Sequence, residues 1–161
     1  MKTTTLLIVS AGFAFSAFAA EEGQREVKLD GIPAAASLTL QKLSAGAKLE
    51  KIIQDTEDGK VTYQAKITKD NFSREVSVDP AGQVISDVSL IALGDAPAAV
   101  RATIEAAAKG GKIESIKRVI QNGKEGFEAL VISEGKREQL LINPDGTVTL
   151  RENKSEERKV E

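Results

Sequence analysis

The chain has 161 residues, of which 29% are charged and 4% aromatic, and its net charge is −2 at pH 7. It contains no cysteine and no histidine, which excludes disulfide bonds, thiol nucleophiles, histidine-dependent triads and the common zinc sites. Because the charge is mixed and mildly acidic and aromatic residues are few, no nucleic-acid partner is expected.

Residues 1–19 have the pattern of a signal peptide. Lys2 supplies one positive charge, an apolar run follows at residues 6–18, and an A-x-A pattern ends at Ala19. The run is shorter than the roughly 20 residues that a bilayer-spanning helix requires. We therefore expect cleavage after Ala19, a periplasmic or secreted location, and no membrane insertion after cleavage. An uncleaved N-terminal anchor is the alternative.

The rest of the chain consists of two segments that match each other at an offset of 64 positions without a gap. Prolines and glycines, which mark where helices and turns form, fall at the same places in both segments. The coincidence predicts two tandem repeats, residues 27–85 and 91–150, with residues 86–90 as the linker. Matched positions include Pro33 and Pro97, Gly46 and Gly110, Gly59 and Gly123, and Gly82 and Gly146.

Each repeat is expected to begin with an amphipathic helix. A proline suits the first helical turn, apolar residues follow at the i, i+4, i+7 spacing of one helix face, and a glycine fits the C-terminal end. These residues are Pro33, Ala36, Leu40, Leu43 and Gly46 in the first repeat and Pro97, Val100, Ile104, Ala107 and Gly110 in the second.

Alternating polar and apolar residues after each helix predict four antiparallel strands. The first turn of each repeat carries Asp58-Gly59 or Asn122-Gly123, and such pairs are strong hairpin signals because both central residues can adopt a positive φ. The expected fold class is α+β: two tandem repeats, each with one helix packed on a four-stranded antiparallel meander sheet. Residues 151–161 hold four basic and four acidic residues but one apolar residue, so a charged flexible tail is expected there.

The two predicted sheets differ on the face that the helix does not cover. In the first repeat this face is polar, with Lys66, Thr68 and Ser77 among its residues. The matching positions in the second repeat are Leu130, Ile132 and Leu141. We expect these three side chains to be covered, either by the other repeat or the linker, which would make them an interdomain surface, or by a partner protein.

No residue pattern identifies a catalytic, metal or cofactor site. The chain lacks a P-loop and a dinucleotide-binding fingerprint. The segment at residues 55–60 has acidic residues, but their spacing is not that of a calcium loop and a hairpin explains them better. We therefore expect a protein that is not an enzyme and uses no cofactor.

The helix opening in Pro-Ala-Ala, the Gly-Lys-Ile-Glu of residues 111–114, the Asp/Asn-Gly-Lys turns and the Pro-x-Gly turns resemble the PepSY-like domains of exported bacterial proteins. These domains are related to the beta-lactamase-inhibitor-protein-like group. The resemblance covers two tandem copies, nearly all of residues 27–150, and carries over no functional residue. It implies an exported non-catalytic binding module that inhibits or modulates a peptidase in the periplasm or outside the cell. A structural or envelope-associated protein with no discrete ligand is the alternative.

Overall fold

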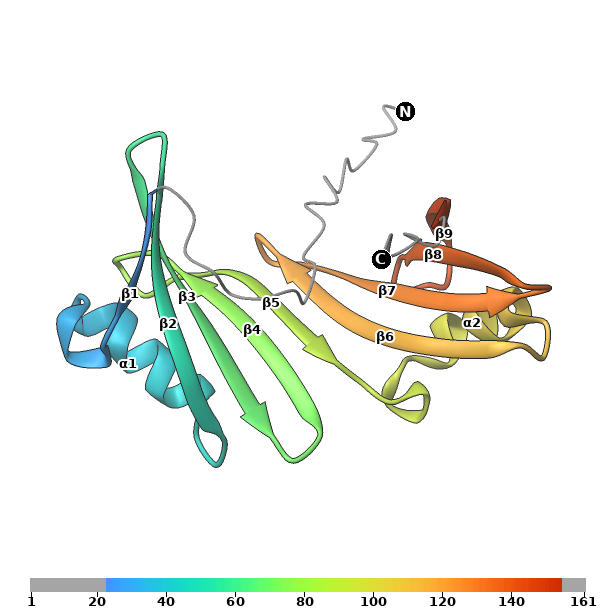
Figure 1. Ribbon diagram of the computed structural model, residues 1–161, viewed down its shortest axis with the longest axis horizontal. Coiled ribbons are helices and arrows are strands. Elements are labelled where there is room, and N and C mark those ends of the chain that lie inside the picture. The colour runs from blue at the N-terminus through green and yellow to red at the C-terminus, as the bar shows by residue number, and fades with distance from the viewer. Residues whose placement is uncertain (1–22, 155–161) are drawn as a thin grey trace, which may run out of the picture.

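The computed structural model describes residues 23–154. Within this range the strands form one antiparallel sheet in chain order, and two α-helices pack against it (Figure 1). The strands are β1 (Gln24–Val27), β2 (Lys48–Glu57), β3 (Lys60–Lys69), β4 (Phe72–Val78), β5 (Val84–Leu90), β6 (Lys112–Gln121), β7 (Lys124–Ser133), β8 (Lys136–Ile142) and β9 (Val148–Lys154). The helices are α1 (Ala34–Leu43) and α2 (Ala98–Ala108), preceded by the 3-10 turns η1 (Leu29–Gly31) and η2 (Leu93–Asp95).

The hairpins turn where the Asp-Gly and Asn-Gly pairs predicted. Asp58 and Gly59 have φ of 49° and 75°, and Asn122 and Gly123 have φ of 50° and 76°. Two successive residues at positive φ match the right-handed twist of the strands on either side. The prediction that Gly59 and Gly123 lie in tight hairpins with positive φ is confirmed.

Each helix covers its own apolar core. Ala36 and Leu40 of α1 are fully buried, as are Val100 and Ile104 of α2, at positions that the helical spacing predicted. Pro33 and Pro97 stand immediately before the first helical residue. The first core comprises Ile32, Ala36, Leu40, Ile52, Tyr63, Ala65, Ile67, Val76 and Val78. The second comprises Ala96, Val100, Ile104, Ala107, Ala108, Ile116, Phe127, Ala129, Val131, Leu140 and Ile142.

The last turn of each half packs directly on the helix of that half. Thr39 of α1 donates its hydroxyl to the carbonyl of Gly82 at 2.9 Å, and Thr103 of α2 makes the same bond to Gly146 at 2.8 Å. Gly82 has φ of +81°, and a Cβ there would lie 2.6 Å from the carbonyl oxygen of Ala35. Only glycine allows this approach of turn to helix.

Residues 86–90 are not a linker, which corrects the prediction. They belong to β5, which pairs with β4 on one side and with β6 on the other, so the two meanders form one continuous sheet rather than two separate ones. The second half of β5 also takes the place of β1. Val88 and Leu90 pair with Val119 and Lys117, as Gln24 and Glu26 pair with Asp55 and Ile53 at positions 64 residues earlier.

Both helices lie on the same face of the sheet. Val76 of the first core pairs with Asp87, which pairs with Ile120, and paired residues share a face. Ile116 of the second core lies four residues before Ile120 on β6, hence on that face too. We call this the helix face and the opposite one the open face. In Figure 1, α1 and α2 lie at opposite ends of the molecule.

Of the predictions for the two ends of the chain, the structure tests only the one for residues 151–154. The signal peptide at residues 1–19 and the tail at residues 155–161 lie outside the described residues. Residues 151–154, which were expected to belong to the flexible tail, instead complete β9 and pair with β8. The tail prediction is wrong for these residues, because the ladder from Ile142 to Arg137 provides partners for the whole of β9.

Candidate functional site

The open face of the second half carries a group of aliphatic side chains that we call the apolar patch. Val88 and Leu141 are 4% and 7% exposed, and the others are half-buried. Register places them in two neighbouring groups: Val88 pairs with Val119, Leu141 pairs with Leu150, and the Lys117–Glu128 pair lies between the groups. The patch consists of Val88 and Leu90 on β5, Val119 on β6, Leu130 and Ile132 on β7, Leu141 on β8 and Leu150 on β9.

The three residues singled out from the sequence belong to this patch. Leu130 and Ile132 alternate with Ala129 and Val131, which face α2, and Leu141 pairs with Glu128 on the open face. None of the three is a member of either helix-covered core. Sequence analysis missed Val88, Leu90, Val119 and Leu150, although the same offset of 64 residues could have found them.

The first half uses polar residues at the corresponding positions of the same fold. Lys66, Thr68 and Ser77 correspond to Leu130, Ile132 and Leu141, while Gln24, Glu26, Asp55 and Ser86 correspond to Val88, Leu90, Val119 and Leu150. Because the strands have the same bounds at the 64-residue offset, the backbone does not require an aliphatic residue at any of these places. The five half-buried members of the apolar patch are therefore a feature of the second half's surface, whereas Val88 and Leu141 are buried within the chain.

A row of charged side chains crosses the open face and passes through the patch between Leu90 and Leu141. Four ion pairs form along it: Lys51 with Glu26 at 3.5 Å, Lys66 and Lys48 with Glu50 at 3.6 and 3.7 Å, and Lys117 with Glu128 at 3.1 Å. Glu75 of β4 also belongs to this row, in register with Lys66 on one side and Val88 on the other. Burial raises the pKa of Glu75, and the attraction of Lys66 and Lys117 opposes that shift.

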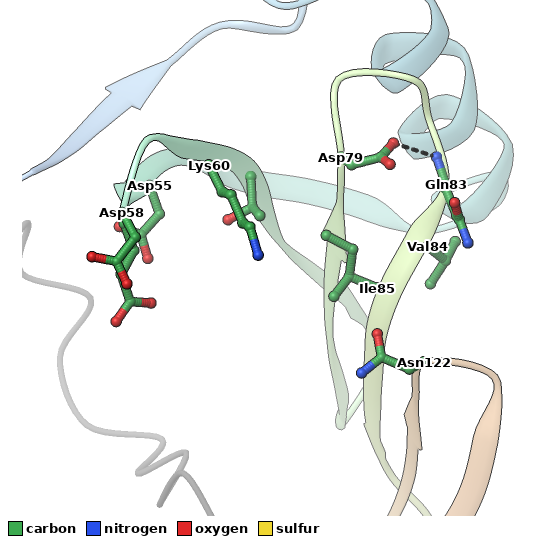
Figure 2. A pocket seen from close by; sticks show the side chains of 10 residues that line it. Asp55, Asp58, Lys60, Asp79, Gln83, Val84, Ile85 and Asn122 are labelled. Carbon is green, nitrogen blue, oxygen red and sulfur yellow. Dashed lines mark hydrogen bonds between the residues drawn. The ribbon is translucent and has the colours of Figure 1, made fainter.

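A hollow lies at the end of the sheet, between the β2–β3 hairpin and the β4–β5 turn (Figure 2). It has a volume of about 540 Å³, and Asp55, Glu57, Asp58 and Asp79 give it an acidic lining. Two of these acids have structural roles: Asp55 accepts hydrogen bonds from Gln24 and Gln64, and Asp79 accepts one from the Gln83 amide within its turn. No group of three potential metal ligands was found within residues 23–154.

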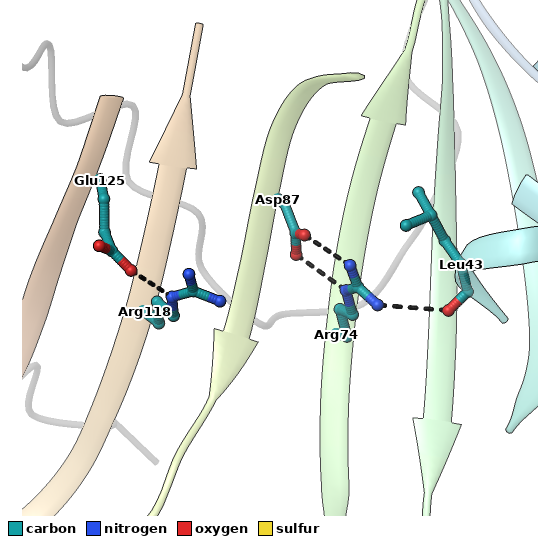
Figure 3. Close-up of polar contacts among 5 residues, drawn as sticks. All are labelled: Leu43, Arg74, Asp87, Arg118 and Glu125. Atoms are coloured by element: carbon teal, nitrogen blue, oxygen red, sulfur yellow. Dashed lines mark hydrogen bonds and ion pairs between the residues drawn. The ribbon is translucent and has the colours of Figure 1, made fainter. Parts of the chain in front are cut away.

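The helix face carries polar contacts where the two halves join (Figure 3). Arg74 donates two bonds to the Asp87 carboxylate, at 2.9 and 2.6 Å, and a third to the carbonyl of Leu43 at the end of α1. This bidentate bond raises the pKa of Arg74, although burial opposes the shift. On β6 and β7, Arg118 forms an ion pair with Glu125.

The Arg74–Asp87 pair has a counterpart of opposite polarity in the second half. The positions 64 residues later hold Glu138 and Arg151, which lie 3.9 Å apart across β8 and β9. The contact is therefore retained while the acid and the base exchange strands. This pair is looser and more exposed than the first one, with half of the Arg151 side chain accessible.

Comparison with known proteins identifies the fold. No family model and no curated protein matches the sequence. A BLIP-like protein from Bacteroides fragilis superposes with a TM-score of 0.58 at 16% identity, covering 81% of this chain and 92% of that one. A DUF2874 family protein from Bacteroides uniformis has a TM-score of 0.57 at 19% identity, with coverages of 75% and 88%.

A third solved structure, a protein assigned to the periplasm of Bacteroides eggerthii, has a TM-score of 0.58 at 20% identity over 76% of this chain and 88% of that one. The chain is thus an α+β protein whose fold is similar to the BLIP-like and DUF2874 structures. No helix in residues 23–154 is long and apolar enough to cross a membrane.

Proposed function

We propose that this protein is a periplasmic, non-catalytic binding module, built from two tandem PepSY-like repeats, that binds a partner protein through the apolar patch and thereby inhibits or modulates a peptidase. The observation that carries the proposal is the contrast between the halves of the open face. Seven positions that are polar in the first half are aliphatic in the second, where the fold itself does not demand it.

The energetics of the patch favour a protein ligand. Burying a fully exposed aliphatic side chain contributes roughly 1.5–3 kcal/mol, and the five half-buried side chains of the patch retain a fraction of this in proportion to their exposed surface. Aliphatic side chains with charged pairs next to them are typical of a protein–protein contact, which combines apolar and polar residues. Arg137 with Glu114 lies at the border of the patch, whereas Lys117 with Glu128 crosses it between Leu90 and Leu141.

The comparisons support the location and the class. One matched structure is BLIP-like, and another is assigned to the periplasm. An N-terminal segment with the features of a signal peptide agrees with export. The chain lacks the histidine and cysteine that the common hydrolytic sites need, which favours binding over catalysis.

The test is capture of partners from the native periplasm with the wild-type protein and with a Leu130→Ser, Ile132→Ser double variant. These two residues are half-buried, so the variant should fold, which thermal unfolding verifies. A Lys66→Ser, Thr68→Ser variant changes the corresponding positions of the first half and serves as the control. We expect wild type and control, but not the patch variant, to capture a peptidase and reduce its activity.

Two results would contradict the proposal. Equal capture by the patch variant would mean that the partner binds elsewhere. Absence of any stoichiometric partner for the wild-type protein would favour the alternative of a structural or envelope-associated protein with no discrete ligand.

A further inference from the structure

Within the described residues, Glu75 is the acid of the charged row that has no lysine or arginine side chain within 4 Å. Each of the other acids in the row lies within 4 Å of a lysine, and Glu50 has two such neighbours, Lys66 and Lys48. Among residues 23–154, no hydrogen bond or ion pair reaches the Glu75 carboxylate. Glu75 is therefore a half-buried acid without an ion-pair partner among these residues.

The surroundings of Glu75 do not satisfy a carboxylate. It lies in register with Val88 of the apolar patch, and Ser73 and Ser77 flank it on the same face of β4. Burial dominates its raised pKa even though Lys66 and Lys117 attract the charge. A half-buried acid at the border of an apolar surface is stabilised when a cation arrives, because the new pair offsets the lost hydration.

We propose that Glu75 binds a lysine or arginine side chain of the partner protein, whose aliphatic stem lies on Leu90. This inference rests on the proposed function, since it names the chemistry of the partner at the same patch. Lysine and arginine combine an apolar stem with a charged end, which is the combination that a carboxylate beside aliphatic residues fits.

Comparison with the second half indicates that Glu75 serves binding rather than folding. The corresponding residue is Gln139, a neutral side chain of the same shape, and it is 9% exposed on the same face of β8. A glutamine therefore satisfies the fold at this position. An anionic group of the partner fits less well, because Lys66 and Lys117 already have carboxylate neighbours at 3.6 and 3.1 Å.

Three small amphiphiles with the same alkyl chain test the inference on the full-length mature protein. Octylammonium, octanol and octanoate are titrated separately at neutral pH, and binding is followed by amide chemical shifts of β4 to β9. We expect all three to shift the patch residues and octylammonium to bind roughly fivefold to tenfold more tightly than octanol, as one new charged contact would produce. The carboxyl carbon of Glu75 should then titrate at a lower pH.

Two variants make the result specific. Glu75→Gln should remove the preference for octylammonium and leave octanol affinity unchanged. Glu26→Gln removes an acid that is already paired with Lys51 and should leave the preference intact. If octylammonium binds no more tightly than octanol, or octanoate binds most tightly, the inference about Glu75 is wrong while the patch stands. If none of the probes shifts the patch residues, the inference fails together with the proposed binding surface.

Discussion

Replacing Gly82 by alanine should reveal how closely the β4–β5 turn is packed on α1. Both Gly82 and Gly59 have a positive φ, +81° and +75°, but their surroundings differ. A Cβ at Gly82 would lie 2.6 Å from the Ala35 carbonyl oxygen and 2.9 Å from the Thr39 hydroxyl, whereas a Cβ at Gly59 meets nothing within 4 Å. The pair of variants therefore separates backbone strain from steric overlap.

The expected magnitudes follow from these contacts. Left-handed backbone costs an alanine about 1–2 kcal/mol, and this cost applies to both variants, as does the entropy that alanine removes from the unfolded chain. Forcing a carbon against a helix carbonyl adds about 1–3 kcal/mol. We expect the free energy of unfolding to fall by about 1–2 kcal/mol for Gly59→Ala and by about 2–5 kcal/mol for Gly82→Ala.

Equilibrium urea denaturation followed by circular dichroism measures both losses, provided that the slopes remain equal to that of the wild type. The second half offers a repeat of the experiment. A Cβ at Gly146 would lie 2.8 Å from the Ala99 carbonyl oxygen, and one at Gly123 meets nothing within 4 Å. A Gly82→Ala protein as stable as Gly59→Ala would refute the close packing of this turn on α1.

Four further outcomes are expected. Arg74→Met should lower the free energy of unfolding, measured in urea, by about 2–3 kcal/mol because its charged hydrogen bonds are lost. Arg151→Met removes a pair that spans 3.9 Å at an exposed site and should lower it by less than about 1 kcal/mol. Equal losses for the two variants would contradict this expectation. Because burial raises the pKa of Glu75, the folded wild type binds more protons than the unfolded chain between the ordinary glutamate pKa and the raised one, so its stability falls as pH rises through that window. Glu75→Gln should therefore be more stable than the wild type at neutral pH and should lose this advantage in acid. A stability difference between the two proteins that does not change with pH would contradict this expectation. Mass spectrometry of the exported protein should find Ala20 as its first residue, and an intact N-terminus would disprove cleavage. The double variant Glu138→Arg with Arg151→Glu reverses the second ion pair and should change the free energy of unfolding by less than about 0.5 kcal/mol. It should increase the fraction of dimer formed on refolding, because it removes the like-charge contacts that oppose wrong pairing of the strands. Size-exclusion chromatography that shows no increase in dimer would contradict this role of the charges.

Local signals predicted the helices and hairpins because their causes are local. Positive φ at Gly59 depends on the turn, and burial of Leu40 depends on the helical spacing. Residues 86–90 were misjudged because β5 gains its partner β6 from the other half. Asp87 also inverts the expected alternation: it points toward the helix face, where Arg74 binds it, while Val88 and Leu90 point to the open face. That inversion made a strand resemble a polar connection.

The candidate site could be predicted from the sequence where positions of the second half could be compared with the matching positions of the first. Leu130, Ile132 and Leu141 stood out against polar residues at the matching positions, and their common face follows from strand alternation. The role of Glu75 was not predictable, because an unpaired acid is recognised only after the neighbouring lysines have been assigned to other carboxylates. Charge pairing across strands depends on register, which no short pattern in this sequence encodes.

The opposite polarity of the two ion pairs, Arg74–Asp87 and Glu138–Arg151, opposes wrong pairing between the similar strands of the two halves. Similar strands within one chain can mispair, which is a characteristic failure of repeated units. If β4 paired with β9 instead of β5, Arg74 would lie beside Arg151, and if β8 paired with β5, Glu138 would lie beside Asp87. Like charges side by side are destabilising. In the native register each arginine meets an acid, so the charge pattern stabilises the correct pairing and opposes both exchanges.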